Sequence, residues 1–230
     1  VLERETALAY HASGRSAAMF EESYGAPSTI ALNKASRDYH FEANGGVTSP
    51  RGLMLIGTAD STQAFQTDLV DMQLQQISVD DARAMFPILN NSITQIGYSA
   101  GAWDLDTDLL VQNFAREVRG NGGMVRTSAE VTAVSRTATG WDVTIGEEVL
   151  SARNLVNAAG AWVDVIAQMA GIAPLGVTPL RRSMARIPAP GGHDVSSWPM
   201  LFGPGENWYA KPDAGALIVS PADEVLMPPM

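Results

Sequence analysis

The sequence contains no cysteine among its 230 residues. This absence excludes disulfide bonds, thiolate metal ligands and cysteine nucleophiles. A chain without cysteine fits a reducing compartment, and we therefore expect a cytoplasmic protein. The three histidines, His11, His40 and His193, show no metal-ligand spacing with one another or with acidic residues. We therefore expect no zinc or iron site.

Basic residues and long apolar runs are also scarce. The 15 Lys and Arg residues face 25 acidic ones, for a net charge of −10, which argues against nucleic acid as a partner. No uninterrupted apolar run reaches the roughly 20 residues that a membrane-spanning helix needs. We therefore expect no membrane span. A hydrophobic content of 46% with 17% charged residues is typical of a globular protein with one large domain or two interleaved ones.

The periodicity of apolar residues predicts a mixture of helices and strands. In TDLLVQNFAREVRGNGG, Val111, Phe114, Ala115 and Val118 share one helical face, and Thr107 is a candidate N-cap. The same reasoning predicts further helices over residues 17–24, 29–43, 61–74, 80–85 and 162–172. Strand patterns occupy residues 1–3, 51–60, 124–136, 140–145, 154–160, 179–187, 207–212 and 215–221. The sequence therefore predicts an α/β (α+β mixed) architecture with a second, sheet-rich unit after Val177.

The chain opens with two apolar residues that lead into Glu3. In dinucleotide-binding folds an acidic residue at the end of the second strand accepts hydrogen bonds from the ribose hydroxyls. The G-x-G-x-x-G turn that should precede such a strand is absent from the sequence. A solvated strand end is the simpler interpretation of Glu3 taken alone. Because the sequence starts at Val1 rather than Met and ends soon after a strand-like stretch, we expect an internal fragment of a longer protein.

Four segments in order resemble the FAD-dependent oxidoreductases that include D-amino-acid oxidase, glycine oxidase and sarcosine oxidase. They are VLERE, HASGRSAAMF, AEVTAV and LVNAAGAWVDVIAQMAGI. The last is the most specific, and WYAKPDAGALIVSPADE is similar to the family's late substrate-domain hairpin. The resemblance implies a Rossmann-like FAD-binding layer with an interleaved antiparallel-sheet substrate domain. It assigns residues 1–46 and 105–176 to the former, and residues 47–104 and 177–230 to the latter.

The resemblance also implies which residues hold FAD. Backbone N–H groups at a helix start after Ser13 would favour an anion, and small residues at 158–160 would let the backbone approach a ligand closely. Simple N-capping and tight helix packing explain the same residues without a ligand. The implied cofactor contacts are Glu3, Arg4, Ser13, Gly14, Arg15, Ser16, Val131 (through its backbone), Ala158, Ala159, Gly160 and Trp162.

The implied reaction is oxidation of the C–N bond of an amino acid or related secondary amine, by hydride transfer to flavin N5. The expected partner is thus a small amine or amino acid, with an electron acceptor that the sequence does not identify. Enzymes of this family commonly hold the substrate carboxylate with a cationic side chain. The candidates for substrate contact are Lys211, with Tyr209 two residues earlier on the same strand face, and Arg181 or Arg182.

Three alternatives remain open at this stage. An FAD-dependent alcohol or glycerol-phosphate dehydrogenase would need a basic cluster for the phosphate, which Arg181, Arg182 and Arg186 could supply. A serine hydrolase could use Ser99, because GYSAG matches the G-x-S-x-G nucleophile elbow, although no helix is predicted directly after it. A non-catalytic binding module would keep the fold without turnover.

Overall fold

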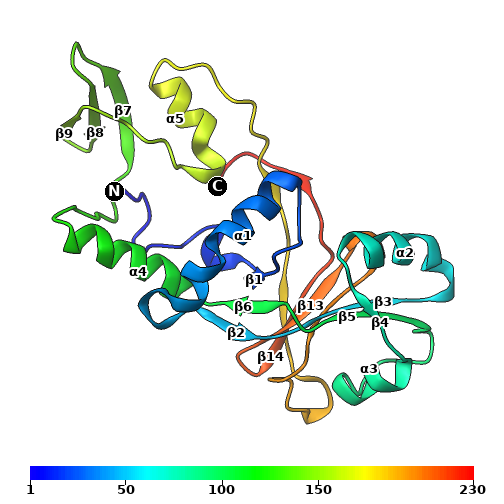
Figure 1. The fold of residues 1–230 in the computed structure, drawn as a ribbon. Helices are drawn as coiled ribbons and strands as arrows, with labels where there is room; N and C mark the ends of the chain where they lie inside the picture. The colour runs from blue at the N-terminus through cyan, green and yellow to red at the C-terminus, as the bar shows by residue number, and fades with distance from the viewer. The chain divides into compact units, whose positions relative to one another are not determined.

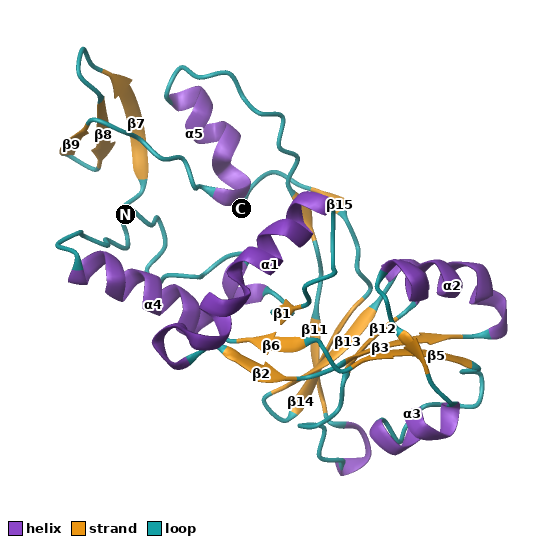
Figure 2. Cartoon of the chain, viewed as in Figure 1, coloured by secondary structure: helices purple, strands orange, loops and turns teal.

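The computed structural model describes the whole chain, from Val1 to Met230, as two compact units. The first unit comprises Val1–Ser16, Thr107–Arg181 and Val225–Met230, and the second comprises Ala17–Asp106 and Arg182–Glu224. Both are mixed α/β structures (Figures 1 and 2). Residues 17–46, which the sequence assigned to the FAD-binding part, cluster with the second unit. Because compactness groups residues by contact and not by ligand, the functional division stays a prediction.

The first unit is built around a helix and an antiparallel meander. Helix α4 covers Thr107–Gly120, as the apolar spacing predicts, although Phe114 is 45% exposed. The meander has the strand order β7-β8-β9, and Val143 and Ile145 of its central strand are buried. The remaining bounds are β7 Val131–Arg136, β8 Trp141–Ile145, β9 Glu148–Ala152, α5 Val163–Met169, β10 Leu180–Arg181 and β15 Val225–Leu226.

Two strands that the sequence predicts in the first unit are not formed. Residues 1–3 make only an isolated parallel bridge between Leu2 and Arg126, although the Glu3 N–H donates to the Arg126 carbonyl at 2.8 Å. Residues 154–159 carry no strand at all, and Val156 is 83% exposed. A strand exists only where its backbone groups find a partner strand, and the apolar pattern of 154–159 does not supply one.

The second unit contains a seven-stranded sheet with the order β11-β14-β13-β12-β3-β5-β4. All its neighbouring strands are antiparallel except β12 and β3, which are parallel. The predicted late hairpin is confirmed as β13 and β14, with Lys211 opposite Ile218. The bounds are β3 Leu53–Gly57, β4 Gln75–Gln76, β5 Gln95–Ser99, β11 Ala185–Pro188, β12 Met200–Phe202, β13 Tyr209–Asp213 and β14 Ala216–Ser220.

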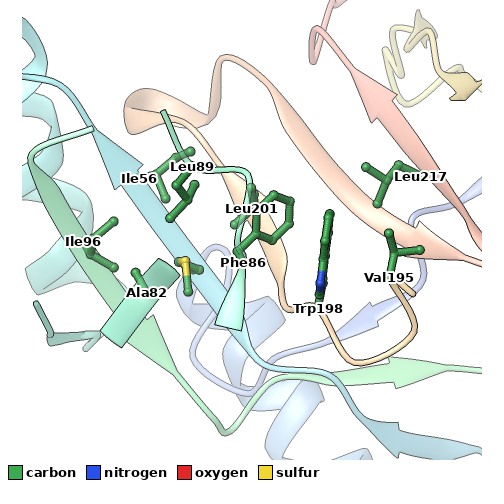
Figure 3. Close-up of a cluster of buried hydrophobic side chains, with 10 residues drawn as sticks. Ile56, Ala82, Phe86, Leu89, Ile96, Val195, Trp198, Leu201 and Leu217 are labelled. Atoms are coloured by element: carbon green, nitrogen blue, oxygen red, sulfur yellow. The ribbon is translucent and has the colours of Figure 1, made fainter. Parts of the chain in front are cut away.

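Helices cover both faces of this sheet because the side chains of β3 alternate between two cores. On one face, Phe65 of α2 (Thr62–Asp71) packs with the buried Leu53 and Leu55. On the other face, α3 (Val79–Met85) and the 193–198 loop cover a second core. Figure 3 shows the rings of Phe86 and Trp198 side by side in that core. Their centroids are 4.1 Å apart.

A smaller sheet of order β1-β6-β2 completes the second unit. Its strands are β1 Met19–Phe20, β6 Trp103–Leu105 and β2 Thr48–Pro50, and β6 pairs antiparallel with both neighbours. The helix predicted over 17–24 is wrong, because Ala18 has a φ of 53° and the next residues pair with β6. The helix predicted over 29–43 is confirmed as α1, Pro27–Glu42. No helix in the chain has both the length and the apolar character needed to cross a membrane.

Candidate functional site

Glu3 lies beside the segment that leads into β7. Its carbonyl accepts a hydrogen bond from the Ala129 N–H at 2.8 Å, two residues before Val131. One carboxylate oxygen, Oε1, accepts the Glu5 N–H at 2.8 Å, and the other makes no hydrogen bond within the chain. The side chain is half-buried. Glu3 therefore keeps one carboxylate oxygen without a hydrogen bond, and its contact with the cofactor stays a prediction.

Arg4 and Trp162, two of the predicted cofactor residues, meet in the structure. The Arg4 guanidinium lies 4.6 Å from the centroid of the Trp162 ring, and the His11 ring lies 4.7 Å from the same ring. Glu5 joins the two partners, with Oε1 2.7 Å from Arg4 Nη2 and 2.9 Å from His11 Nε2. The hydrogen bonds from Arg4 and His11 lower the pKa of the Glu5 carboxyl. This cluster ties the segment after Glu3 to the turn before α5.

The turn at 158–160 is open. Gly160 has a φ of 53°, a left-handed conformation that favours glycine, and no atom lies within 4 Å of the position that a Cβ would occupy. Ala158 and Gly160 are exposed, and Ala159 is half-buried. The backbone of this turn is therefore uncovered, and the cofactor contacts of Ala158, Ala159 and Gly160 stay a prediction.

The segment from Ser13 to Ser16 differs from the prediction. Ser13–Arg15 form a single 3₁₀ turn and no helix follows, so the expected helix N-terminus for an anion is not formed. A Cβ on Gly14 would lie 2.0 Å from the Ala9 carbonyl oxygen, so the backbone's own packing explains this glycine. Arg15 stacks on Tyr10 at 4.7 Å. Cofactor contacts from Ser13, Gly14, Arg15 and Ser16 stay a prediction.

In the second unit, Lys211 lies in a buried cluster of charges and not on the surface. Its Nζ is 2.8 Å from Asp104 Oδ1 and donates to the Ala17 carbonyl at 2.6 Å. Arg51 donates to the other Asp104 oxygen, Oδ2, from Nε at 2.8 Å and from Nη2 at 2.6 Å. The exposed fractions of the Lys211, Arg51 and Asp104 side chains are 9%, 13% and 19%. Two cations thus share one carboxylate, which leaves one positive charge uncompensated.

Sequence reasoning missed Arg51 and Asp104. The three members of the cluster are separated by 53 and 107 positions along the chain, and no local motif connects such residues. Tyr209, predicted to share a strand face with Lys211, is half-buried and packs against the core that contains Phe65. Lys211 is thus buried beside charged partners and Tyr209 packs on a core, and the roles of both as substrate contacts stay a prediction.

The three arginines considered for a phosphate do not form a free basic cluster. Arg182 pairs with Glu224 at 2.7 Å, and Arg186 pairs with Asp213 at 3.0 Å. Arg181 is exposed on β10, opposite Val225. Two of these charges are therefore already compensated by carboxylates.

Ser99 does not lie on a nucleophile elbow. It is the last residue of β5, where it pairs with Leu53, and its Oγ accepts the Gly101 N–H at 3.1 Å. The chain then turns into β6 and not into a helix. The elbow requires a strand–turn–helix arrangement, so the geometry removes the hydrolase alternative. No group of three or more His, Asp or Glu side chains could hold a metal ion.

A protein-family model described as "FAD dependent oxidoreductase" matches residues 1–228. Human dimethylglycine dehydrogenase, mitochondrial, is 31% identical over 98 residues, which are 42% of this chain and 11% of that protein.

Glycine oxidase and L-alpha-glycerophosphate oxidase are among the solved structures that share the fold. Glycine oxidase from Geobacillus kaustophilus superposes with a TM-score of 0.74 at 20% identity, over 95% of this chain and 62% of that one. L-alpha-glycerophosphate oxidase from Mycoplasma pneumoniae, with FAD bound, superposes with a TM-score of 0.74 at 16% identity, over 95% of this chain and 63% of that one. The chain therefore spans less than two thirds of either structure.

Proposed function

Because the chain belongs to the FAD dependent oxidoreductase family, we propose that it oxidises the C–N bond of an amino acid or related amine. The observation that carries this choice of substrate is the buried cluster of Lys211, Arg51 and Asp104, which has one positive charge to spare. A substrate carboxylate would compensate that charge. Glycine oxidase and dimethylglycine dehydrogenase, to which the chain is similar, are named for substrates that carry both an amine and a carboxylate.

In this proposal some residues bind the cofactor and others bind and orient the substrate. Glu3 would accept hydrogen bonds from the ribose of FAD, and the open turn at Gly160 would let the backbone approach the cofactor. Arg4 and Trp162 would hold these two segments together. Lys211 would bind the substrate carboxylate and so orient the carbon that bears the amine. FAD, when bound, supplies the hydride acceptor, and the protein supplies position and charge.

The similarity to glycerophosphate oxidase makes a phosphate-bearing alcohol the second candidate. A phosphate would need more positive charge than a carboxylate does. The pairing of Arg182 with Glu224 and of Arg186 with Asp213 favours the amine.

A visible absorption spectrum tests the proposal. We expect the protein, expressed from its complete reading frame, to show flavin bands near ~375 and ~450 nm, the signature of the chromophore. We expect glycine, L-proline or N,N-dimethylglycine to bleach the bands anaerobically, and glycerol 3-phosphate to leave them unchanged. A colourless protein that does not take up FAD would contradict the flavoenzyme assignment. Bleaching by glycerol 3-phosphate alone would replace the amine with an alcohol.

The variant Glu3→Gln tests the cofactor cradle. Because the substitution removes a charged acceptor but keeps the side chain's shape, we expect FAD affinity to fall about 10- to 100-fold. The measurement is the quenching of flavin fluorescence as FAD is titrated into the deflavinated protein. Glu147→Gln is the matched control, because Glu147 is exposed in the turn between β8 and β9. Equal FAD affinity in both variants would show that the Glu3 carboxylate does not contribute to FAD binding.

A further inference from the structure

We propose that Arg51 is a positioning residue that sets the net charge of a carboxylate-binding site at Lys211. Arg51 neutralises Asp104 and so leaves the charge of Lys211 available to an anion. This inference rests on the proposed function, because it takes the substrate carboxylate as the anion.

The arrangement of hydrogen bonds supports this division of roles. Arg51 uses Nε and Nη2 on Asp104, and its Nη1 donates to the carbonyls of Ser196 at 2.6 Å and Trp198 at 2.9 Å. All three guanidinium nitrogens are therefore occupied. The Lys211 ammonium has three N–H groups, of which one donates to the Ala17 carbonyl. Its Nζ lies 2.8 Å from Asp104 Oδ1 as an ion pair, although that oxygen makes no hydrogen bond in the chain. Lys211 thus keeps at least one N–H for a ligand, whereas each Arg51 nitrogen already has a partner.

The cluster of Arg51, Lys211 and Asp104 has a net positive charge. Arg51 and Lys211 each form an ion pair with Asp104 and with no second carboxylate. The cluster therefore carries a net charge of +1 in a place where the side chains are less than one fifth exposed. An excess positive charge in a buried cluster is costly, so binding of an anion at Lys211 is favourable.

The cluster also connects the two sheets of the second unit. Asp104 lies on β6, between Met19 of β1 and Ser49 of β2, whereas Lys211 lies on β13 of the seven-stranded sheet. The ion pair between Asp104 and Lys211 joins these sheets within the second unit. The position of the ammonium is therefore fixed by two elements that are themselves paired on both sides.

The test is a set of variants that change the net charge in steps. Arg51→Gln lowers it from +1 to 0, Asp104→Asn raises it to +2, and the double variant restores +1. The probe is acetate, observed by ligand NMR at neutral pH, with neutral acetamide as the reference. We expect Arg51→Gln to weaken acetate binding roughly 10- to 100-fold, and the double variant to recover most of that loss. Arg83→Gln, which removes a surface ion pair on α3, should leave acetate binding unchanged.

Each outcome supports or overturns the proposal. A purely structural role predicts that the double variant is at least as impaired as Arg51→Gln, and that result would refute the charge argument. If Arg51→Gln does not fold, the test rests on Asp104→Asn. An acetate affinity of Asp104→Asn that is no higher than that of the wild type then overturns the proposal. With substrate, Arg51→Gln should raise KM and leave kcat within about threefold. If the wild type binds acetate but no amine bleaches its flavin absorption, the proposed function is refuted while the anion site is still supported.

Discussion

Replacing Lys211 with methionine is expected to raise KM for amino-acid substrates about 100-fold or more, because the substrate carboxylate loses its charged partner in a buried site. The fold should survive the change. Asp104 remains neutralised by the two donating nitrogens of Arg51, so no uncompensated charge is left behind. Steady-state kinetics on the flavin-loaded protein would measure the effect, with circular dichroism as the check on folding.

The chain offers a matched control for this experiment, because Lys34 is its other lysine. Lys34 lies exposed on α1, and Lys34→Met should leave KM unchanged. If Lys211→Met binds the substrate as the wild type does, Lys211 serves only to fasten the Ala17 carbonyl to β13. The carboxylate site would then have to be sought elsewhere, and the inference about Arg51 would fail with it.

The sequence predicts well those elements whose signal is local. The helix that begins at Thr107 was predicted because its apolar spacing lies within one short segment, and the hairpin around Lys211 was implied by the family resemblance of one continuous segment. Residues 154–159 have an apolar pattern, yet they form no strand, since strand formation depends on a distant partner. Residues 1–3 pair with the segment at Arg126, but only as an isolated bridge. Periodicity reports which residues avoid water, and it does not report which segments pair.

The same limit applies to the candidate site. Glu3 and Trp162 were predicted from motifs, and the structure adds that the Arg4 guanidinium joins their segments. Arg51 and Asp104 could not be predicted, because a salt bridge across 53 positions leaves no pattern in either neighbourhood. Lys211 was identified from the sequence as a cation on a strand, and only the structure shows that it shares Asp104 with Arg51.

The strand that carries Lys211 depends on the core of the second unit, and we expect Phe65→Ala to destabilise that unit by about 3–5 kcal/mol. Phe65 is fully buried, and its ring lies so close to Gly57 that a Cβ there would be 2.9 Å from Cδ2. Truncation therefore leaves a cavity against a backbone that is paired on both sides in the sheet. Urea unfolding followed by circular dichroism would measure the loss.

Val70→Ala on the same helix is the control for Phe65→Ala, because Val70 is 70% exposed and should change the stability by less than about 0.5 kcal/mol. The loss of stability should also affect the charge cluster, because β12 lies between β3, on which Phe65 packs, and β13, which carries Lys211. We therefore expect acetate affinity in Phe65→Ala to fall at urea concentrations that leave the Val70→Ala site intact. Equal loss of acetate binding in both variants would show that the charge cluster is held by the small sheet at Asp104 and not by this core.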